Sequence, residues 1–185
     1  MLRTRYIAQA GVIAAVYGGL TWLMLAFGGV FAWGPIQFRL SEAATVLAVF
    51  TPAAIPGLAL GSVLANLLNP QAVWPFSALD VVLGSLGTLL GAMWTWRFRS
   101  RTWLALLGPI VTNALIVAAY LPIVLKGVGV PMTPVLGISL TGAWLPLYGV
   151  LVITIGIGQA VVVYGLGLPL LIALRRTGIA GLLGR

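Results

Sequence analysis

Long apolar stretches, with charged residues only at their ends, constrain the fold of this chain more than any other feature. Residues 6–28 and 102–125 contain no charged side chain, and neither does the whole of 127–174. A helix that crosses a membrane needs about 20 consecutive, mainly apolar residues, and these stretches reach that length. They are continuous rather than alternating, which excludes the strands of a membrane barrel. The sequence therefore predicts an all-α integral membrane protein.

The composition agrees with this class of protein. Hydrophobic residues make up 61% of the sequence and charged residues 6%, whereas soluble domains are about 25% charged. The first apolar stretch follows Met1 and two arginines, and it is longer than the apolar core of a signal peptide. We interpret this stretch as a retained first helix.

We expect residues 1–185 to form a single transmembrane domain of six helices. Their expected bounds are 6–28, 39–51, 54–69, 78–96, 102–125 and 147–174. The second helix is too short to cross about 30 Å of hydrocarbon at about 1.5 Å per residue. It is either tilted or continued by irregular backbone that lines a cavity. Alternatively, the second and third helices form a re-entrant hairpin, which leaves four full spans and the same topology.

The basic residues predict the orientation of these helices. The net charge is +8, and an even number of spans divides the ten basic residues unequally between the two sides of the membrane. One side holds Arg3, Arg5, Arg97, Arg99, Arg101, Arg175, Arg176 and Arg185, and the other holds Arg39 and Lys126. The positive-inside rule then places both termini in the cytoplasm. We interpret the positive charge as the topology signal of a multi-pass protein in the lipid bilayer of a bacterial or archaeal cell membrane, not as a nucleic-acid-binding surface.

The sequence lacks residues that several classes of protein require. It contains no cysteine and no histidine, which argues against zinc and haem sites and excludes His-based catalytic triads. No phosphate-binding glycine-rich loop precedes a Lys-Ser or Lys-Thr pair. We therefore expect no metal, no cofactor and no enzymatic activity in this chain itself.

Polar residues concentrate in the stretch 33–57. A Gly-Pro turn at 34–35 interrupts the apolar sequence, and Gln37, Arg39, Ser41 and Glu42 follow it closely. Glu42 is one of only two acidic residues in the chain. A charge at bilayer depth costs about 2.5–3.5 kcal/mol on insertion scales, so such groups usually face a cavity or a partner. We interpret this stretch as the entrance and one wall of a solute site.

The expected topology brings polar side chains of four successive helices to one level in the outer half of the membrane, with Asn113 deeper. The candidate binding residues are Glu42, Asp80, Asn66, Asn113, Gln37 and Arg39, with Trp33, Trp74 and Tyr148 as aromatic platforms. Carboxylates accept N–H donors, amides pair with carbonyl groups and ring nitrogens, and aromatic rings stack. We therefore expect an outward-opening pocket for a flat, hydrogen-bonding heterocycle.

Each of these residues also has a plainer interpretation. Arg39 and Glu42 are three positions apart, so they are able to pair with each other on a helix. Asp80 suits a helix N-terminus because of the helix dipole. Tryptophans often form a belt at the membrane interface, and buried amides often join neighbouring helices. The convergence of all these groups at one level favours the binding site.

Small residues recur every four positions on the first expected helix. They are Ala10, Ala14 and Gly18, with Gly11, Ala15 and Gly19 beside them. Such spacing allows another helix to approach closely. The pattern alone fits packing within the chain and docking of a partner equally well.

Four segments of the chain are distinctive: Gly34-Pro-Ile-Gln-Phe-Arg-Leu-Ser-Glu-Ala43, Phe50-Thr-Pro-Ala-Ala-Ile-Pro-Gly57, Leu60-Gly-Ser-Val-Leu-Ala-Asn-Leu-Leu68 and Asp80-Val-Val-Leu-Gly-Ser-Leu-Gly-Thr-Leu-Leu90. Together these segments resemble the QueT family of queuosine-precursor transporters. Members of this family act as S components, the substrate-binding subunits of energy-coupling factor (ECF) transporters. The resemblance is tight over the first half of the chain and rests on length and topology in the second.

The resemblance implies six helices and a deazapurine substrate, either queuine or a related 7-deazaguanine. It also implies a complex with a membrane-embedded coupling protein and two cytoplasmic ATPases. S components commonly carry an Ala-x-x-x-Ala motif on the first helix that contacts the coupling protein, and Ala10-Gly-Val-Ile-Ala14 matches it. Ala10, Ala14 and Gly18 are therefore predicted to be docking residues, and residues 29–38 are predicted to form a gate.

We therefore expect the substrate-specific S component of an ECF-type ABC importer that takes up a queuosine precursor. An S component for another vitamin-like solute would share the same features. A second hypothesis is a stand-alone ion-coupled transporter in which Glu42 and Asp80 bind and release protons. A third is a structural subunit that binds no small molecule.

Overall fold

In the computed structural model, the described residues are 2–28, 37–127 and 144–178, and this part of the chain is helical without a strand. Its elements are α1 (Leu2–Phe27), η1 (Leu40–Val49), α3 (Ala54–Leu67), η2 (Asp80–Gly84), α4 (Ser85–Arg97), α5 (Thr102–Gly127), α6 (Trp144–Val162), η3 (Val163–Gly167) and α7 (Leu168–Arg176). Because η2 continues into α4, and α6 continues through η3 into α7, these elements form six helical segments. The predicted all-α membrane bundle of six helices is confirmed.

The six segments differ in length, and only some are long enough to cross a membrane. Three are long and apolar enough to cross a membrane by length and composition: Arg3–Phe27, Thr102–Gly127 and Trp144–Arg176. Helix α3 has 14 residues, which corresponds to about 21 Å at about 1.5 Å per residue. The segment η1 has 10 residues and is also too short to cross about 30 Å of hydrocarbon. The bundle therefore combines long spans with short helices that reach only part of the way.

The expected helix bounds differ from the observed ones by a few residues, and one helix is of another type. Helix α1 begins at Leu2 rather than at residue 6, and α6 begins at Trp144 rather than at 147. The segment expected to be an α-helix over 39–51 is a 3₁₀ helix, Leu40–Val49. Hydrophobic sequence does not distinguish these two helix types, because both bury apolar side chains at spacings of three to four residues.

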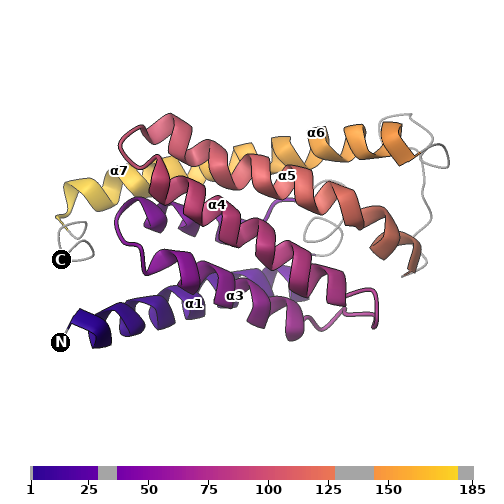
Figure 1. Cartoon of the computed structure of the whole chain (residues 1–185), viewed down its shortest axis with the longest axis horizontal. Coiled ribbons are helices and arrows are strands. Elements are labelled where there is room, and N and C mark those ends of the chain that lie inside the picture. The colour runs from indigo at the N-terminus through magenta and orange to yellow at the C-terminus, as the bar shows by residue number, and fades with distance from the viewer. Residues whose placement is uncertain (1, 29–36, 128–143, 179–185) are drawn as a thin grey trace.

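The segment η1 lies at the centre of the bundle. It contacts α1, α3, α4, α5, α6 and α7. Helices α1 and α3 run along one side of the molecule, α4 and α5 cross its middle, and α6 with α7 runs along the other side (Figure 1). The polar residues that η1 carries are therefore enclosed by all the other helices.

Close packing of α1 on α3 occupies the small-residue stripe of α1. A Cβ atom on Gly61 would lie 2.7 Å from the backbone oxygen of Ala14, and one on Gly57 would lie 2.8 Å from the backbone oxygen of Ala10. A Cβ on Gly18 would in turn lie 3.0 Å from the backbone oxygen of Gly61. Ala10, Ala14 and Gly18 therefore lie at the contact between α1 and α3.

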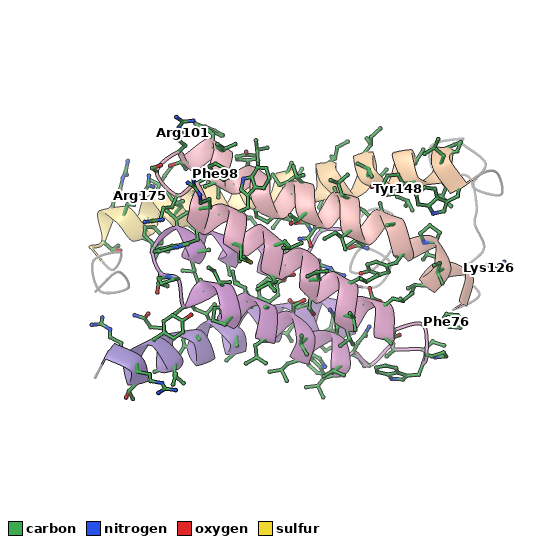
Figure 2. The ribbon with its side chains drawn as sticks, viewed as in Figure 1. Phe76, Phe98, Arg101, Lys126, Tyr148 and Arg175 are labelled. Carbon is green, nitrogen blue, oxygen red and sulfur yellow. The ribbon has the colours of Figure 1, made fainter. Side chains whose placement is uncertain are left out.

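The charged ends of the bundle agree with the expected separation of basic residues. Arg101 and Arg175 lie at one end and Lys126 lies at the opposite end (Figure 2). The start of α1 and the end of α7 lie at the same end as these two arginines (Figure 1). An even number of passes through the bundle requires this arrangement.

Candidate functional site

The segment η1 carries a row of polar residues into the centre of the molecule. With about three residues per turn of a 3₁₀ helix, Arg39, Glu42 and Thr45 line up on one edge. Arg39 is 3% exposed, and Glu42 and Thr45 are fully buried. The Thr45 hydroxyl donates to the backbone oxygen of Glu42 over 2.6 Å. A 3₁₀ helix longer than about four residues is uncommon.

Tyr17 on α1 holds one oxygen of the Glu42 carboxylate. Its hydroxyl donates to Glu42 Oε1 over 2.6 Å and lies 3.4 Å from Thr88 Oγ1 on α4. The second oxygen, Glu42 Oε2, is buried and has no hydrogen-bond partner in the described part of the chain. The carboxylate is therefore fixed by one oxygen while the other remains available to a ligand.

Asn113 on α5 lies beside Glu42, close enough for its amide to interact with that carboxylate. Its side chain is 1% exposed, and neither Nδ2 nor Oδ1 has a hydrogen-bond partner among the described residues. Gly87 on α4 faces it directly, because a Cβ atom there would lie 2.7 Å from Asn113 Oδ1. A buried polar group without a partner costs about 1–3 kcal/mol. An amide left in this state suits a site that a ligand or water completes.

The second acidic residue, Asp80, is fixed by neighbouring helices. Its Oδ1 accepts a 2.8 Å hydrogen bond from the hydroxyl of Tyr120 on α5. Its backbone oxygen accepts one from Asn66 Nδ2 on α3 over 3.0 Å. Asp80 begins η2, a single π-helical turn, and such turns occur frequently at functional sites. Gly84 makes room for this cluster, since a Cβ there would lie 3.0 Å from the Tyr120 hydroxyl.

Arg39 is close enough to both acidic residues to interact with each electrostatically. It interacts in the same way with Tyr17 and Tyr120, the two tyrosines that donate to these carboxylates. Its Nε atom is buried and has no hydrogen-bond partner in the part of the chain that the structure describes. The Arg39 guanidinium therefore lies within electrostatic range of both Glu42 and Asp80.

Helix α6 carries another buried amide and packs against the residues that precede η1. Gln159 is 2% exposed, and its Oε1 atom has no hydrogen-bond partner within the described residues. Its neighbour Gly158 lies directly against the backbone of Gln37 and leaves no room for a side chain. Gln37 itself is 1% exposed. The start of η1 is thereby fixed against α6.

The aromatic residues proposed as stacking platforms lie apart from the buried cluster or outside the described residues. Trp74 is 55% exposed on the connection between α3 and η2. Tyr148 stacks on Trp144 with ring centroids 4.9 Å apart, and its hydroxyl donates to the Leu115 backbone oxygen over 3.3 Å. It lies at the same end of the bundle as Lys126 (Figure 2). Trp33 lies outside the described residues.

The structure adds residues that the sequence did not single out for binding. Tyr17 fixes Glu42, Tyr120 fixes Asp80, and Thr88 lies beside Tyr17. A signal for Tyr17 exists in the sequence, because a phenol in the middle of an apolar helix is far from the interface where tyrosines usually gather.

The chemistry of the cluster is that of a hydrogen-bonding site. The buried atoms without partners in the described residues are Arg39 Nε, Glu42 Oε2, Asn113 Nδ2 and Oδ1, and Gln159 Oε1. They include both donors and acceptors, which a planar ligand with N–H and carbonyl groups would match. Within the described residues, no group of three or more His, Cys, Asp or Glu side chains is placed to hold a metal ion.

Comparison with known proteins places the chain among transporters. The family model described as "QueT transporter" matches residues 7–176. The Queuosine precursor transporter QueT of Lactococcus lactis subsp. cremoris (strain MG1363) is 33% identical over 88 residues, which cover 48% of this chain and 47% of that relative. The matched region thus spans about half the length of that curated relative. No solved structure matches the chain.

Proposed function

Because the chain belongs to the QueT transporter family, we propose that it is the substrate-binding S component of an ECF-type importer for a queuosine precursor. The family and the apolar helices make it a multi-pass protein of the bacterial cell membrane. The precursor class comes from the name of the Lactococcus relative. The observation that best supports a deazaguanine ligand is that Glu42 Oε2 and the neighbouring Asn113 amide are buried without a well-formed hydrogen bond among the described residues.

Glu42 and Asn113 together match one edge of a guanine-like ring. The carboxylate accepts hydrogen bonds from the ring N–H and the exocyclic amine, and the amide of Asn113 donates to the ring carbonyl. Hydrogen bonds to an ionised carboxylate are about twice as strong as those between neutral groups. Tyr17 holds Glu42 in place for this contact. A buried hydrogen-bonding site of this kind rejects analogues that leave its polar groups unpaired.

The other predicted polar residues are also buried. Gln37 is 1% exposed and Asn66 is 2% exposed, and Asn66 bonds to the backbone oxygen of Asp80. Arg39 lies within electrostatic range of both carboxylates. Stacking by Trp33, Trp74 or Tyr148 stays a prediction. For the last two it requires a change from the arrangement seen here, in which Trp74 is exposed and Tyr148 stacks on Trp144.

Transport would depend on partners, namely a membrane coupling protein and two cytoplasmic ATPases that hydrolyse ATP. Since α3 occupies the stripe of Ala10, Ala14 and Gly18, we place the docking surface on the neighbouring exposed row. That row consists of Gly11, Ala15 and Gly19. No atom approaches a Cβ built on Gly11 or Gly19 within 4 Å among the described residues, so another helix has room to pack there.

A binding titration tests the substrate. Purified protein in detergent is titrated with queuine, its aminomethyl and cyano precursors and guanine, followed by the fluorescence of the seven tryptophans and by calorimetry. We expect saturable binding of at least one deazaguanine and weaker binding of guanine. Glu42→Gln is expected to weaken binding of every deazaguanine, whereas the exposed-site control Ser100→Ala is not. A folded sample that binds none of these ligands would refute the proposed substrate.

A stand-alone ion-coupled transporter remains the second candidate function. The observation in its favour is that both acidic side chains lie inside the bundle, each bonded to a tyrosine, as in a site that binds and releases protons. Uptake that follows a proton gradient and continues without ATP would support this candidate. Co-purification with ATPase subunits and ATP-dependent uptake would support the S component.

A further inference from the structure

The charges buried inside the bundle do not balance. Arg39 is 3% exposed, Glu42 is fully buried, and Asp80 is mostly buried. Every other charged side chain in the described residues is exposed near an end of a helix. With all three groups ionised, the buried cluster carries one positive and two negative charges. An uncompensated charge in a low-dielectric interior is costly. Either one of the two carboxyl groups takes up a proton, as the second candidate function requires, or a further positive charge completes the cluster.

The two carboxylates lie at different levels of the bundle. On α4, Gly87 faces Asn113, and Tyr17 joins Glu42 to the adjacent Thr88. Asp80 precedes Gly87 by seven residues, which corresponds to about 10 Å along a helix. On the antiparallel α5, Tyr120 follows Asn113 by the same interval and bonds to Asp80. Asp80 therefore lies about two turns from the Glu42–Asn113 level, at the end of the bundle nearer Lys126.

The distance of about 10 Å between these two levels matches the length of a bicyclic ring with a short substituent. If Glu42 and Asn113 bind the guanine-like edge, the opposite end of the ligand points toward Asp80. The Asp80 side chain is partly exposed, whereas that of Glu42 is buried. A substituent of variable length therefore fits at the level of Asp80. Tyr120 fixes one oxygen of Asp80, as Tyr17 fixes one oxygen of Glu42.

Resting on the proposed function, we propose that the ligand carries a positive charge on the arm at its 7-position and that Asp80 binds this charge. Arg39 neutralises one of the two carboxylates, and the ligand neutralises the other. Of the queuosine precursors, those with a basic amine on this arm fit the site, namely the aminomethyl compound and queuine. The cyano compound is neutral and leaves the cluster with an unbalanced charge.

The test compares three ligands that share one ring. They are the aminomethyl deazaguanine, its N-acetyl derivative, in which the arm is neutral, and the cyano compound. Titrations of the full-length protein are expected to give the amine an affinity about 100-fold higher than that of either neutral ligand, the scale of a buried charge-assisted hydrogen bond. The acetylated ligand requires no change in the protein, so this comparison does not depend on whether a variant folds.

Asp80→Asn identifies the group that binds the amine. We expect this variant to reduce the preference for the amine over the cyano compound by about 30-fold or more. Glu42→Gln is the matched substitution of the other carboxylate. It is expected to weaken the binding of all three ligands, because Glu42 contacts the edge that they share. Melting curves confirm that each variant is folded before it is titrated.

The possible outcomes separate this proposal from the proposed function. Equal affinities of the amine and the neutral ligands would overturn the charge proposal, while the deazaguanine site would stand. A preference for the amine that survives in folded Asp80→Asn would overturn the role of Asp80. Failure of all three ligands to bind the folded wild-type protein would overturn the proposed function, and this inference with it.

Discussion

The Tyr17 hydroxyl donates a 2.6 Å hydrogen bond to Glu42 Oε1 and so joins the middle of α1 to the central 3₁₀ helix. Both residues are fully buried. The bond leaves Glu42 Oε2 as a free acceptor in the interior. Helix α1 also packs on α3 through its small residues. The position of Glu42 Oε2 therefore depends on how α1 packs in the bundle.

Replacing Tyr17 by phenylalanine removes this bond and little else. A hydrogen bond to a charged group contributes about 1.5–3 kcal/mol, so we expect lower thermal stability and roughly tenfold weaker ligand binding. Tyr6→Phe on the same helix is the control, because Tyr6 is 41% exposed. Melting curves and fluorescence titrations of the two variants provide the measurement. Ligand affinity unchanged in Tyr17→Phe would mean that Glu42 does not require this donor.

Replacing Asn113 by leucine is expected to separate stability from binding. Both polar atoms of Asn113 lack partners in the described residues, so an apolar side chain of similar size removes a cost of about 1–3 kcal/mol per group. We expect the ligand-free variant to melt at a higher temperature than wild type and to bind deazaguanine at least about tenfold more weakly. Such an exchange of stability for function is common at binding sites.

Asn66→Leu is the matched control for this prediction. The Asn66 amide donates to the backbone oxygen of Asp80 over 3.0 Å, so its loss leaves that acceptor unpaired and is expected to lower the melting temperature. If Asn113→Leu destabilised the protein as much as Asn66→Leu, the Asn113 amide would have to be paired in the ligand-free protein. The interpretation of Asn113 as a free ligand-binding group would then be wrong.

Much of this fold follows from the sequence because apolar length is a direct signal in a membrane protein. Mainly apolar stretches predicted the six helices, and the family match confirms the resemblance found in the segments around Arg39, Glu42 and Asp80. The 3₁₀ character of Leu40–Val49 could not be predicted, since it depends on packing against the surrounding helices. The same holds for the π turn that begins at Asp80.

The membership of the candidate site was predictable, but the levels and directions of its side chains were not, because Asn113 lies at the level of Glu42 and Asp80 lies about two turns away. Ordering residues by level along the helices brought Glu42, Asp80 and Asn113 into one hypothesis, and the structure places all three around Arg39 and its neighbours. Level alone does not say which side of a helix faces inward. Trp74 and Tyr148 therefore have suitable levels, yet they lie apart from the buried cluster. Only the position of Tyr17 in the middle of an apolar helix indicated that it faces inward.

The orientation of the bundle can be measured with single cysteines, because the chain contains none of its own. Ser100 and Lys126 are both exposed and lie at the ends of different helices. Since the arginine-rich end is expected to face the cytoplasm, Lys126→Cys should react with a membrane-impermeant thiol reagent in intact cells. Ser100→Cys should react only after the cells are permeabilised. The reverse pattern of labelling would invert the predicted topology.

Tryptophan substitutions at adjacent positions of α1 distinguish packing within the chain from docking of a partner. Ala14 is 4% exposed and its backbone oxygen would lie 2.7 Å from a Cβ on Gly61, so Ala14→Trp is expected to prevent folding by overpacking this contact. Ala15 is exposed, so Ala15→Trp is expected to preserve the melting temperature and ligand binding while abolishing ATP-dependent uptake. The reason is that a bulky side chain would hold the coupling protein away from the row of Gly11, Ala15 and Gly19.

Ile153→Trp provides the control for an exposed tryptophan elsewhere on the bundle. Ile153 lies on α6 and is 62% exposed, so this variant is expected to bind ligand and support uptake at the wild-type rate. Uptake that survives in Ala15→Trp would place the docking surface elsewhere. Ligand binding that survives in Ala14→Trp would show that α1 and α3 separate without loss of the site, because the Tyr17–Glu42 bond would then have to form without the close contact between these two helices.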